Sequence, residues 1–205
     1  MATSDVDIAN VALRLLKAQR ISSLTDGTKN ANVVNDIFTE IRESLLGDHN
    51  WGFATKRVKL ARSSTTPVFD FDYGYVLPSD WLRTVSVHDN DAGTGTIEYQ
   101  EEELEDQGVL MASVEDVYLV YIYKVTDPNR MSAACRKAFA YELAVSMPGI
   151  NNISATREAE LRREARKALR KAKSKDGMGS TQPRRPQGTW RNSRSSWPHW
   201  RIWPD

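Results

Sequence analysis

The stretch from Met131 to Met147 constrains the fold of this chain most, because its apolar residues cover most of a helical circumference. One face repeats at four-residue steps and the adjoining face is also apolar; the members are Met131, Cys135, Phe139, Leu143 and Met147, then Ala134, Ala138, Tyr141 and Val145. Only Arg136, Lys137 and Glu142 clearly need water. The pattern predicts a buried helix with other elements packed around it.

The residues at both ends of this stretch mark where the helix begins and ends. Asp127 is a suitable N-cap and Pro128 suits the first helical position. Pro148-Gly149 can neither continue a helix nor resist a turn. We therefore expect the helix to start after Asp127 and to stop before Pro148.

Two amphipathic helices are predicted before the strands begin. Ser4 and Asp7 have the spacing of a capping box, which predicts a first helix ending near Gln19. After the turn signal Asp26-Gly27, apolar residues at helical spacing predict a second helix running to about His49. Because the connection is short, the two helices are expected to pack antiparallel.

A fourth helix is predicted from Thr156 to about Lys175, with acidic residues near its start and basic residues near its end. Its apolar stripe is narrow and shallow, and consists of Leu161, Ala165, Ala168, Leu169 and Ala172. A helix with so little apolar surface is expected to extend into solvent and to depend on assembly contacts for its order.

Between the second and third helices the periodicity changes to that of strands. Residues 69–77 alternate apolar and polar and end at Pro78, and Val85 and Val87 indicate another strand. Gly93-Thr94-Gly95 is typical of a hairpin turn before a strand at 97–100. Residues 117–125 are apolar on both faces, as in a central strand.

These patterns predict an α+β protein, in which an antiparallel helical bundle carries a small β module inserted between helices two and three. The predicted parts are an N-terminal helical hairpin (1–50), the β module (51–126), C-terminal helices completing the bundle (127–177) and an extended arm (178–205). The charge is divided too: residues 1–153 hold 14 Lys and Arg against 22 Asp and Glu, whereas residues 154–205 hold 14 against 5. An acidic body thus carries a basic C-terminal quarter.

The sequence contains few of the motifs that enzymes use for catalysis. One cysteine excludes an internal disulfide and a cysteine-cluster metal site, and no phosphate-binding Gly-rich loop or nucleophile elbow is present. Histidines occur only at 49, 88 and 199, far apart in sequence. Cys135 lies in the apolar helix, where a buried thiol is expected. We therefore expect no catalytic, cofactor or metal site, and the absence of a long apolar run gives no reason to expect a membrane partner.

An acidic run follows the predicted hairpin and consists of Glu101, Glu102, Glu103, Glu105 and Asp106. A solvated loop is one explanation and a cation site another, although the spacing of a calcium loop is missing. A third is that these carboxylates face nucleic acid and repel it, which requires that the protein form a channel.

The C-terminal segment interleaves aromatic and basic residues, with Trp190, Trp197, Trp200 and Trp203 accompanied by Arg191 and Arg201. Such a segment could stack on bases and neutralise phosphates, as single-strand-binding segments do. It could equally insert into a partner protein, because Trp and Arg dominate interface hot spots. The prolines and bulky rings favour the protein partner.

Several motifs in series resemble one known family. They are Ile21-Ser-Ser-Leu-Thr-Asp-Gly, Asn30-Ala31, Arg42 with Leu45-Leu46, Trp51-Gly-Phe-Ala54 with Lys56-Arg57 and Leu60, Tyr73-Gly-Tyr75-Val-Leu77-Pro78-Ser-Asp80-Trp-Leu82-Arg83-Thr-Val85, and Tyr121-Ile-Tyr-Lys-Val-Thr126-Asp127-Pro128 leading to Leu143-Ala144. Over residues 5–175 the chain resembles the tail tubular protein A family of tailed bacteriophages, and the arm departs from the pattern.

The resemblance implies a structural head-to-tail adaptor found in the virion at the head-tail junction and made in the bacterial cytoplasm. Such proteins form a dodecameric ring beneath the portal, with a helical part toward the portal and a β part toward the tail nozzle or tail tube protein. Genomic DNA passes through without specific binding. On this hypothesis the four tryptophans of the arm, with Arg191 and Arg201, bind the portal and the acidic run faces the channel. The alternatives are a nucleic-acid-binding protein that uses the arm, and a hydrolase whose site the sequence hides.

Overall fold

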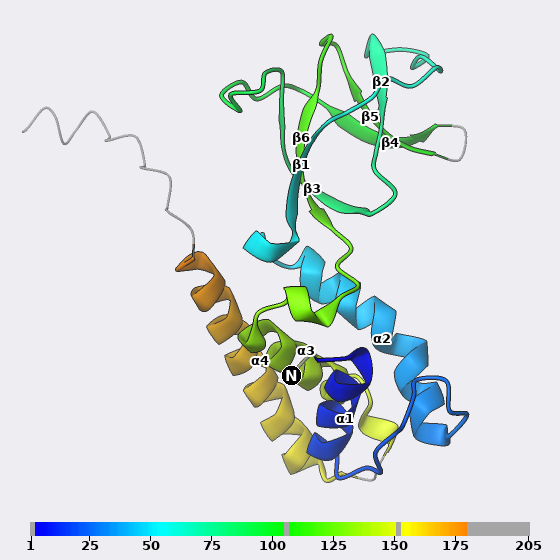
Figure 1. Cartoon of the computed structure of the whole chain (residues 1–205), viewed down its shortest axis with the longest axis vertical. Helices are drawn as coiled ribbons and strands as arrows, with labels where there is room; N and C mark the ends of the chain where they lie inside the picture. Colours follow the sequence, from blue (N-terminus) through cyan, green and yellow to red (C-terminus); the bar gives the residue numbers. More distant parts are fainter. Residues whose placement is uncertain (1–2, 105–106, 151–152, 180–205) are drawn as a thin grey trace, which may run out of the picture.

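The computed structural model describes residues 3–104, 107–150 and 153–179. The molecule is elongated, with four helices at one end and two β-sheets at the other (Figure 1). We call the first part, α1 to α4, the helical unit and the second, β1 to β6, the β unit. The chain enters the β unit after α2 and leaves it before α3.

The predicted central helix is α3 (Ala133–Val145), and it contacts all three other helices. All five members of its four-residue repeat are buried, from Met131 to Met147. The predicted start of this helix is wrong, because Asp127 and Pro128 begin a separate 3-10 turn (Pro128–Arg130) that precedes it. The N-cap of α3 is Ser132, whose side chain accepts from the Cys135 amide. Asp127 instead accepts from the Asn129 amide.

The first helix starts as predicted but ends at Leu15 rather than near Gln19, the second ends near the predicted His49, and the two do not pair as predicted. The capping box of α1 (Asp5–Leu15) is confirmed, with the Ser4 and Asp7 side chains each accepting from the other's backbone N–H. Thr28 caps α2 (Lys29–Gly47). Both helices pack mainly against α3 rather than against each other, because α3 offers apolar side chains on nearly every side. The prediction of an N-terminal helical hairpin is therefore wrong.

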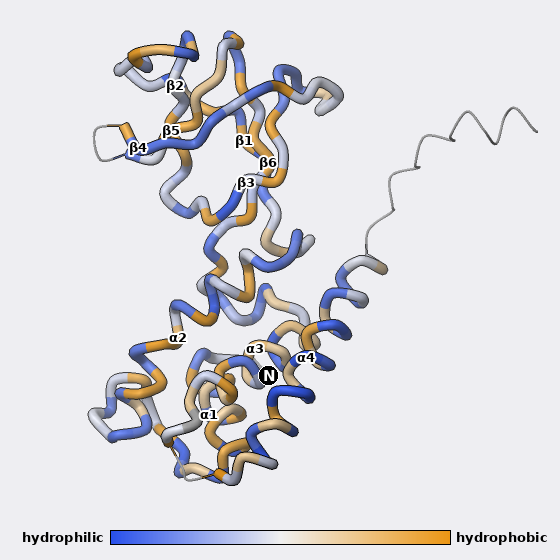
Figure 2. Tube along the Cα trace, turned by 180° about the vertical axis from the view of Figure 1, so that it is seen from behind, coloured by the Kyte–Doolittle hydropathy of each residue, from blue (hydrophilic) through white to orange (hydrophobic). Residues whose placement is uncertain are grey.

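The last helix, α4 (Ala155–Gly177), runs along the outside of α3. Leu161, Ala165 and Ala172 of the predicted stripe are buried, whereas Ala168 and Leu169 are partly exposed. Figure 2 shows α4 mainly in hydrophilic colours beside the more apolar α3. The small stripe lets α4 lie close to α3 while most of its surface remains in water.

One antiparallel sheet of the β unit has the order β1-β6-β3. Its strands are β1 (Thr55–Lys59), β6 (Tyr118–Tyr123) and β3 (Trp81–His88). The predicted central strand is confirmed, because β6 pairs on both edges and Leu119, Tyr121 and Ile122 are buried. A 3-10 turn (Gly52–Ala54) leads from α2 into β1.

The other sheet has the order β2-β5-β4, from β2 (Tyr73–Val76), β5 (Gln107–Ala112) and β4 (Gln100–Leu104). The chain after β1 joins the sheets: the Leu60 amide donates to Val117, and the Ser63 amide then donates to Gly74. The predicted strand at 69–77 starts too early, since Phe69 is 75% exposed and pairing with β5 begins at Tyr73. Nor does a strand cover residues 97–99; β4 begins at Gln100.

Taken together, these arrangements correct the predicted architecture. The class is α+β, but the helices are interrupted by strands and do not form an antiparallel bundle with a small β insert. The strands form two three-stranded sheets that occupy one whole end of the molecule (Figure 1). The hydrogen bonds between residues 61–63 and β2 join segments with no shared sequence signal, so periodicity could not reveal how large this unit is. Residues 180–205 of the predicted arm lie outside the described residues.

Candidate assembly surfaces

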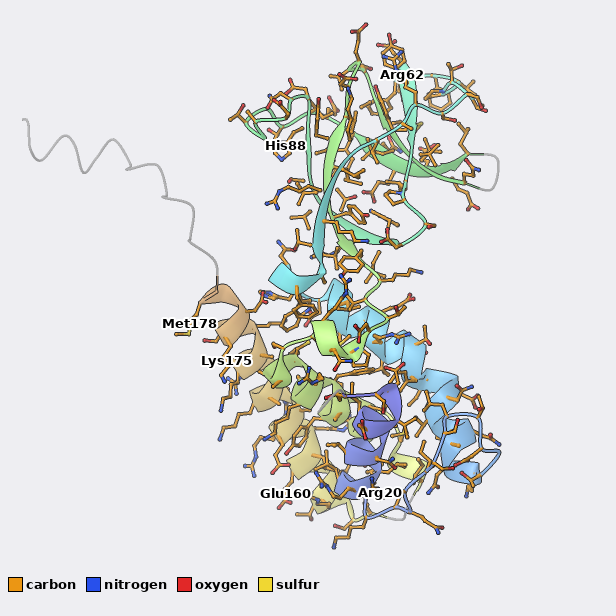
Figure 3. The ribbon with its side chains drawn as sticks, viewed as in Figure 1. Arg20, Arg62, His88, Glu160, Lys175 and Met178 are labelled. Atoms are coloured by element: carbon orange, nitrogen blue, oxygen red, sulfur yellow. The ribbon has the colours of Figure 1, made fainter. Side chains whose placement is uncertain are left out.

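The side chains first considered for chemistry are His49, His88 and Cys135, and the structure shows the surroundings of each. His49 lies at the end of α2 beside Asp176 and Trp51, whereas His88 lies in the β unit, where its ring bonds Gly95 and Ser86 (Figure 3). Within residues 3–104, 107–150 and 153–179 no three His, Cys, Asp or Glu side chains are placed to hold a metal ion. Burial raises the pKa of the Cys135 thiol to about 12, so it is no nucleophile near neutral pH. His199 lies outside the described residues.

The connection between the two units is built around Trp51. Its indole is fully buried, its Nε1 donates to the Leu45 carbonyl at 2.9 Å, and Phe53 and His49 pack against its ring. A buried tryptophan with a satisfied N–H fixes both position and direction of the chain it belongs to. The passage from α2 into β1 is thereby held to the helical unit.

The C-terminal end of α4 also contacts the segment that leads from α2 into β1. The Asp176 carboxylate accepts from the Gly52 amide at 3.0 Å, and Lys173 pairs with Asp48 at 2.6 Å. A carboxylate at a helix C-terminus opposes the helix dipole, so its presence calls for a tertiary partner. Sequence reasoning missed Asp176, although this unfavourable position was the available signal.

Asp80 links the strands that face the helical unit. Its carboxylate pairs with Lys56 at 2.5 Å and accepts from the Tyr121 hydroxyl at 3.0 Å, and its carbonyl accepts from the Lys124 amide. Burial raises the pKa of Asp80, but the bonds from Lys56 and Tyr121 outweigh it and hold the pKa below its usual value. Next to this network, Arg83 donates to Asn50 at 2.5 Å.

We call this region, formed by Trp51, Gly52, Lys56, Asp80, Arg83, Tyr121, Lys173 and Asp176, the junction. Most of its members belong to the motifs that carry the family resemblance, although they come from distant parts of the sequence. Those motifs therefore specify how the helical and β units are joined.

The acidic run takes a form that the sequence analysis did not expect. Glu101, Glu102 and Glu103 are exposed on β4, an edge strand paired only with β5 among the described residues, so the loop explanation is wrong. Alternation along a strand sends Glu102 to the opposite face from its two neighbours. Charged side chains also protect an open edge from pairing with other strands. Glu105 and Asp106 lie outside the described residues.

An apolar loop tip lies at the end of the β unit away from the helices. Val68 is 90% exposed and Phe69 is 75% exposed, in the loop that follows Arg62. Figure 3 places Arg62 near that end of the molecule. Adjacent large apolar side chains left in water are typical of a surface that contacts a partner. The sequence analysis had assigned Phe69 to a strand.

The outer surface of α4 is basic and borders a groove against α3. Arg163, Arg166, Lys167, Arg170 and Lys171 are exposed, and none makes an ion pair with another described residue. The groove holds about 510 Å3; its lining residues are Ala133, Ala134, Lys137, Tyr141, Glu164, Lys167, Ala168, Lys171 and Lys175. An apolar floor with a basic rim suits an acidic, partly apolar protein surface.

The residues predicted to bind the portal, Trp190, Arg191, Trp197, Trp200, Arg201 and Trp203, lie outside the described residues. No helix in the described part of the chain is long and apolar enough to cross a membrane. Neither models of known protein families nor curated protein sequences match this chain. The family resemblance therefore rests on the motifs alone.

Proposed function

We propose that this chain is the structural head-to-tail adaptor of a tailed bacteriophage, assembling as a dodecameric ring between the portal and the tail nozzle or tail tube protein. The observation that carries the proposal is the junction. Residues of the resembling motifs meet there and join a helical unit to a β unit at opposite ends of an elongated chain. A protein that connects two assemblies needs two ends that stay in register under load.

The chain offers two features suited to protein partners. Val68 and Phe69 at the far end of the β unit supply apolar contact for the tail-side partner. The arm, which continues from the C-terminal end of α4 beside the junction, supplies the tryptophans and arginines for the portal.

In the proposed ring the acidic strand faces the channel. Carboxylates at Glu101 and Glu103 repel DNA phosphates and so reduce the salt-dependent grip that basic side chains would exert. Because Glu102 projects from the other face of the sheet, only part of the run can line the channel at once. Basic side chains dominating the inner surface of an assembled ring would refute this orientation.

The basic surface of α4 favours a second candidate, a nucleic-acid-binding protein. Five exposed, unpaired basic side chains along one helix can neutralise phosphates, and the arm would extend that surface. Filter binding with single- and double-stranded DNA at increasing salt distinguishes the two functions. A nucleic-acid-binding protein should retain DNA with a steep salt slope, whereas the adaptor should bind weakly.

The direct test is functional joining in vitro. Filled heads lacking the adaptor are mixed with the full chain and then with tails, and infectious particles are counted. Addition of the chain should raise the count by several orders of magnitude, and Val68→Asp/Phe69→Asp should lose most of that gain while still binding heads. Heads that join tails equally well without the chain would overturn the proposal.

A further inference from the structure

The helical unit has surfaces of opposite charge on its two flanks. In Figure 1, α4 and α2 lie on opposite sides of the pair formed by α1 and α3, and their middle turns are at about the same level along the long axis. The outer face of α4 is basic, as described above. The outer face of α2 is acidic, because Asp36 and Glu40 are exposed and make no ion pair with any described residue.

The two faces also match in their apolar content. The groove beside α4 has a floor of Ala133, Ala134 and Ala168 with the Tyr141 ring. On α2, Ile37 and Ile41 are only partly buried and lie one turn apart on the same side of the helix, adjoining Asp36 and Glu40. An amphipathic helix that places its apolar side in such a groove buries alanine and isoleucine surface while its carboxylates meet the lysines on the rim.

We infer that α4 and the α3–α4 groove of one copy bind the α2 face of a second copy. The site on each copy differs from the site it contacts, so a pair of chains still has a free acidic α2 face on one copy and a free basic α4 face on the other. Such heterologous contacts close into a ring or continue as a helix. The inference deepens the proposed function, since it supplies the subunit contact of the ring, but the contact can be measured without the portal.

Nucleic acid is the other occupant that a basic helix could attract. Two features favour a second copy. Phosphate neutralisation has no use for an apolar floor, and Glu164 on the groove rim would repel phosphates. The complementary acidic surface is present on the same chain at the matching level.

The experiment reverses each face separately in the full chain. One variant carries Lys167→Glu and Lys171→Glu, and the other carries Asp36→Lys and Glu40→Lys. All four side chains are exposed, so the fold should survive both changes. Self-association is measured by sedimentation velocity over a range of protein concentrations and at low and high salt.

Each variant alone should self-associate at least about tenfold more weakly than the unmodified chain. In the first variant the charged residues that line the groove, Lys137, Glu164, Lys175 and the two new carboxylates, sum to −1 instead of +3, and in the second variant α2 is basic like the groove. The two variants mixed in equal amounts should co-assemble, because the acidic groove lining of one then meets the basic α2 of the other. A chain with all four changes should also recover association. The control Arg20→Glu/Arg57→Glu makes the same change of net charge as the first variant at exposed sites outside α2 and α4, and should behave as the unmodified chain.

Three results overturn the inference: an unmodified chain that remains monomeric, single-face variants that associate normally, or a mixture that does not co-assemble. If the α4 variant loses only DNA retention, the helix is a nucleic-acid surface and the inference is wrong. A ring on the portal built by normally associating variants would refute this contact but keep the adaptor. The predicted association pattern without any head joining would keep the contact and refute the adaptor.

Discussion

Trp51 is the single residue whose packing contributes most to the fixed arrangement of the two units. Its side chain is fully buried among groups from the end of α2 and the start of the β unit, and its N–H is satisfied by Leu45. The chain has five other tryptophans, four of them in the last sixteen residues. Trp51 therefore has a packing role that a count of tryptophans does not reveal.

Replacing Trp51 with Ala should lower the free energy of unfolding by about 3–5 kcal/mol, because the change leaves a large cavity and an unpaired carbonyl. Chemical denaturation followed by far-ultraviolet circular dichroism measures this without interference from the other tryptophans. Val68→Ala serves as the control and should change little, since Val68 is 90% exposed. A loss below about 1 kcal/mol would mean that the indole does not hold the junction.

Tyr121 should make the stability of the folded chain depend on pH in the alkaline range. Burial, and then the bond to the Asp80 carboxylate, raises the pKa of the Tyr121 hydroxyl to about 12. A pKa that is higher in the folded than in the unfolded chain gives stability that is complete below the unfolded value near 10 and lost as the pH rises toward 12. Tyr121→Phe should remove that part of the decline, as shown by denaturation at pH 9 to 12. Parallel curves for both proteins would show that Tyr121 does not titrate this way.

At the level of elements, the order of α4 depends on a few contacts. The sequence gives α4 a small apolar stripe, and the structure adds the contacts of Lys173 and Asp176 with the passage between the units. These contacts restrain the C-terminal end, while Leu161 and Ala165 hold the N-terminal half. The two halves should therefore respond differently to substitution.

Asp176→Ala should increase amide exchange in residues 172–177 and leave residues 161–168 protected. Alanine is the better helix former, so any fraying reports the lost contact with Gly52 rather than a lower propensity. Exchange measured by mass spectrometry with peptides covering both halves separates them, and the exposed Lys175→Ala is the matched control. Unchanged protection near residue 176 would mean that the contact adds nothing to the order of α4.

Element types were more predictable than their arrangement. The capping box at Ser4, the buried repeat of α3 and the central strand β6 depend on local patterns, and the structure confirms them. Three predictions were wrong: the pairing of α1 with α2, a strand at Phe69 and a loop at Glu101. Each of these features depends on which distant segment packs or pairs with it, and local patterns do not reveal that partner. The junction was invisible for the same reason: Asp80, Lys56 and Tyr121 meet only through sheet topology.

For the whole molecule, the arm beyond α4 is the part on which attachment to the portal should depend. Pro183, Pro186, Pro198 and Pro204 disfavour helix, and four tryptophans supply anchors of large area with few rotamers. Repetition around a ring raises the effective concentration of the remaining arms once one is bound. Attachment should therefore fall steeply when the arm is removed.

A chain ending at Gly179 should remain folded by circular dichroism, because every element described here lies before that point. It should nevertheless elute from a portal affinity column much earlier than the full chain. Replacing the four tryptophans with Ser in the full chain separates loss of anchors from loss of length. If the shortened chain is retained as firmly as the full chain, the helical unit itself, and not the arm, binds the portal.

The most direct measurement is electron microscopy of the full chain mixed with its proposed partner, purified portal protein. We expect a twelve-fold ring on one face of the portal, with the helical units toward the portal, the β units pointing away, and α4 of each copy beside α2 of the next. Particles that show the portal alone, or the chain bound without rotational order, would contradict it.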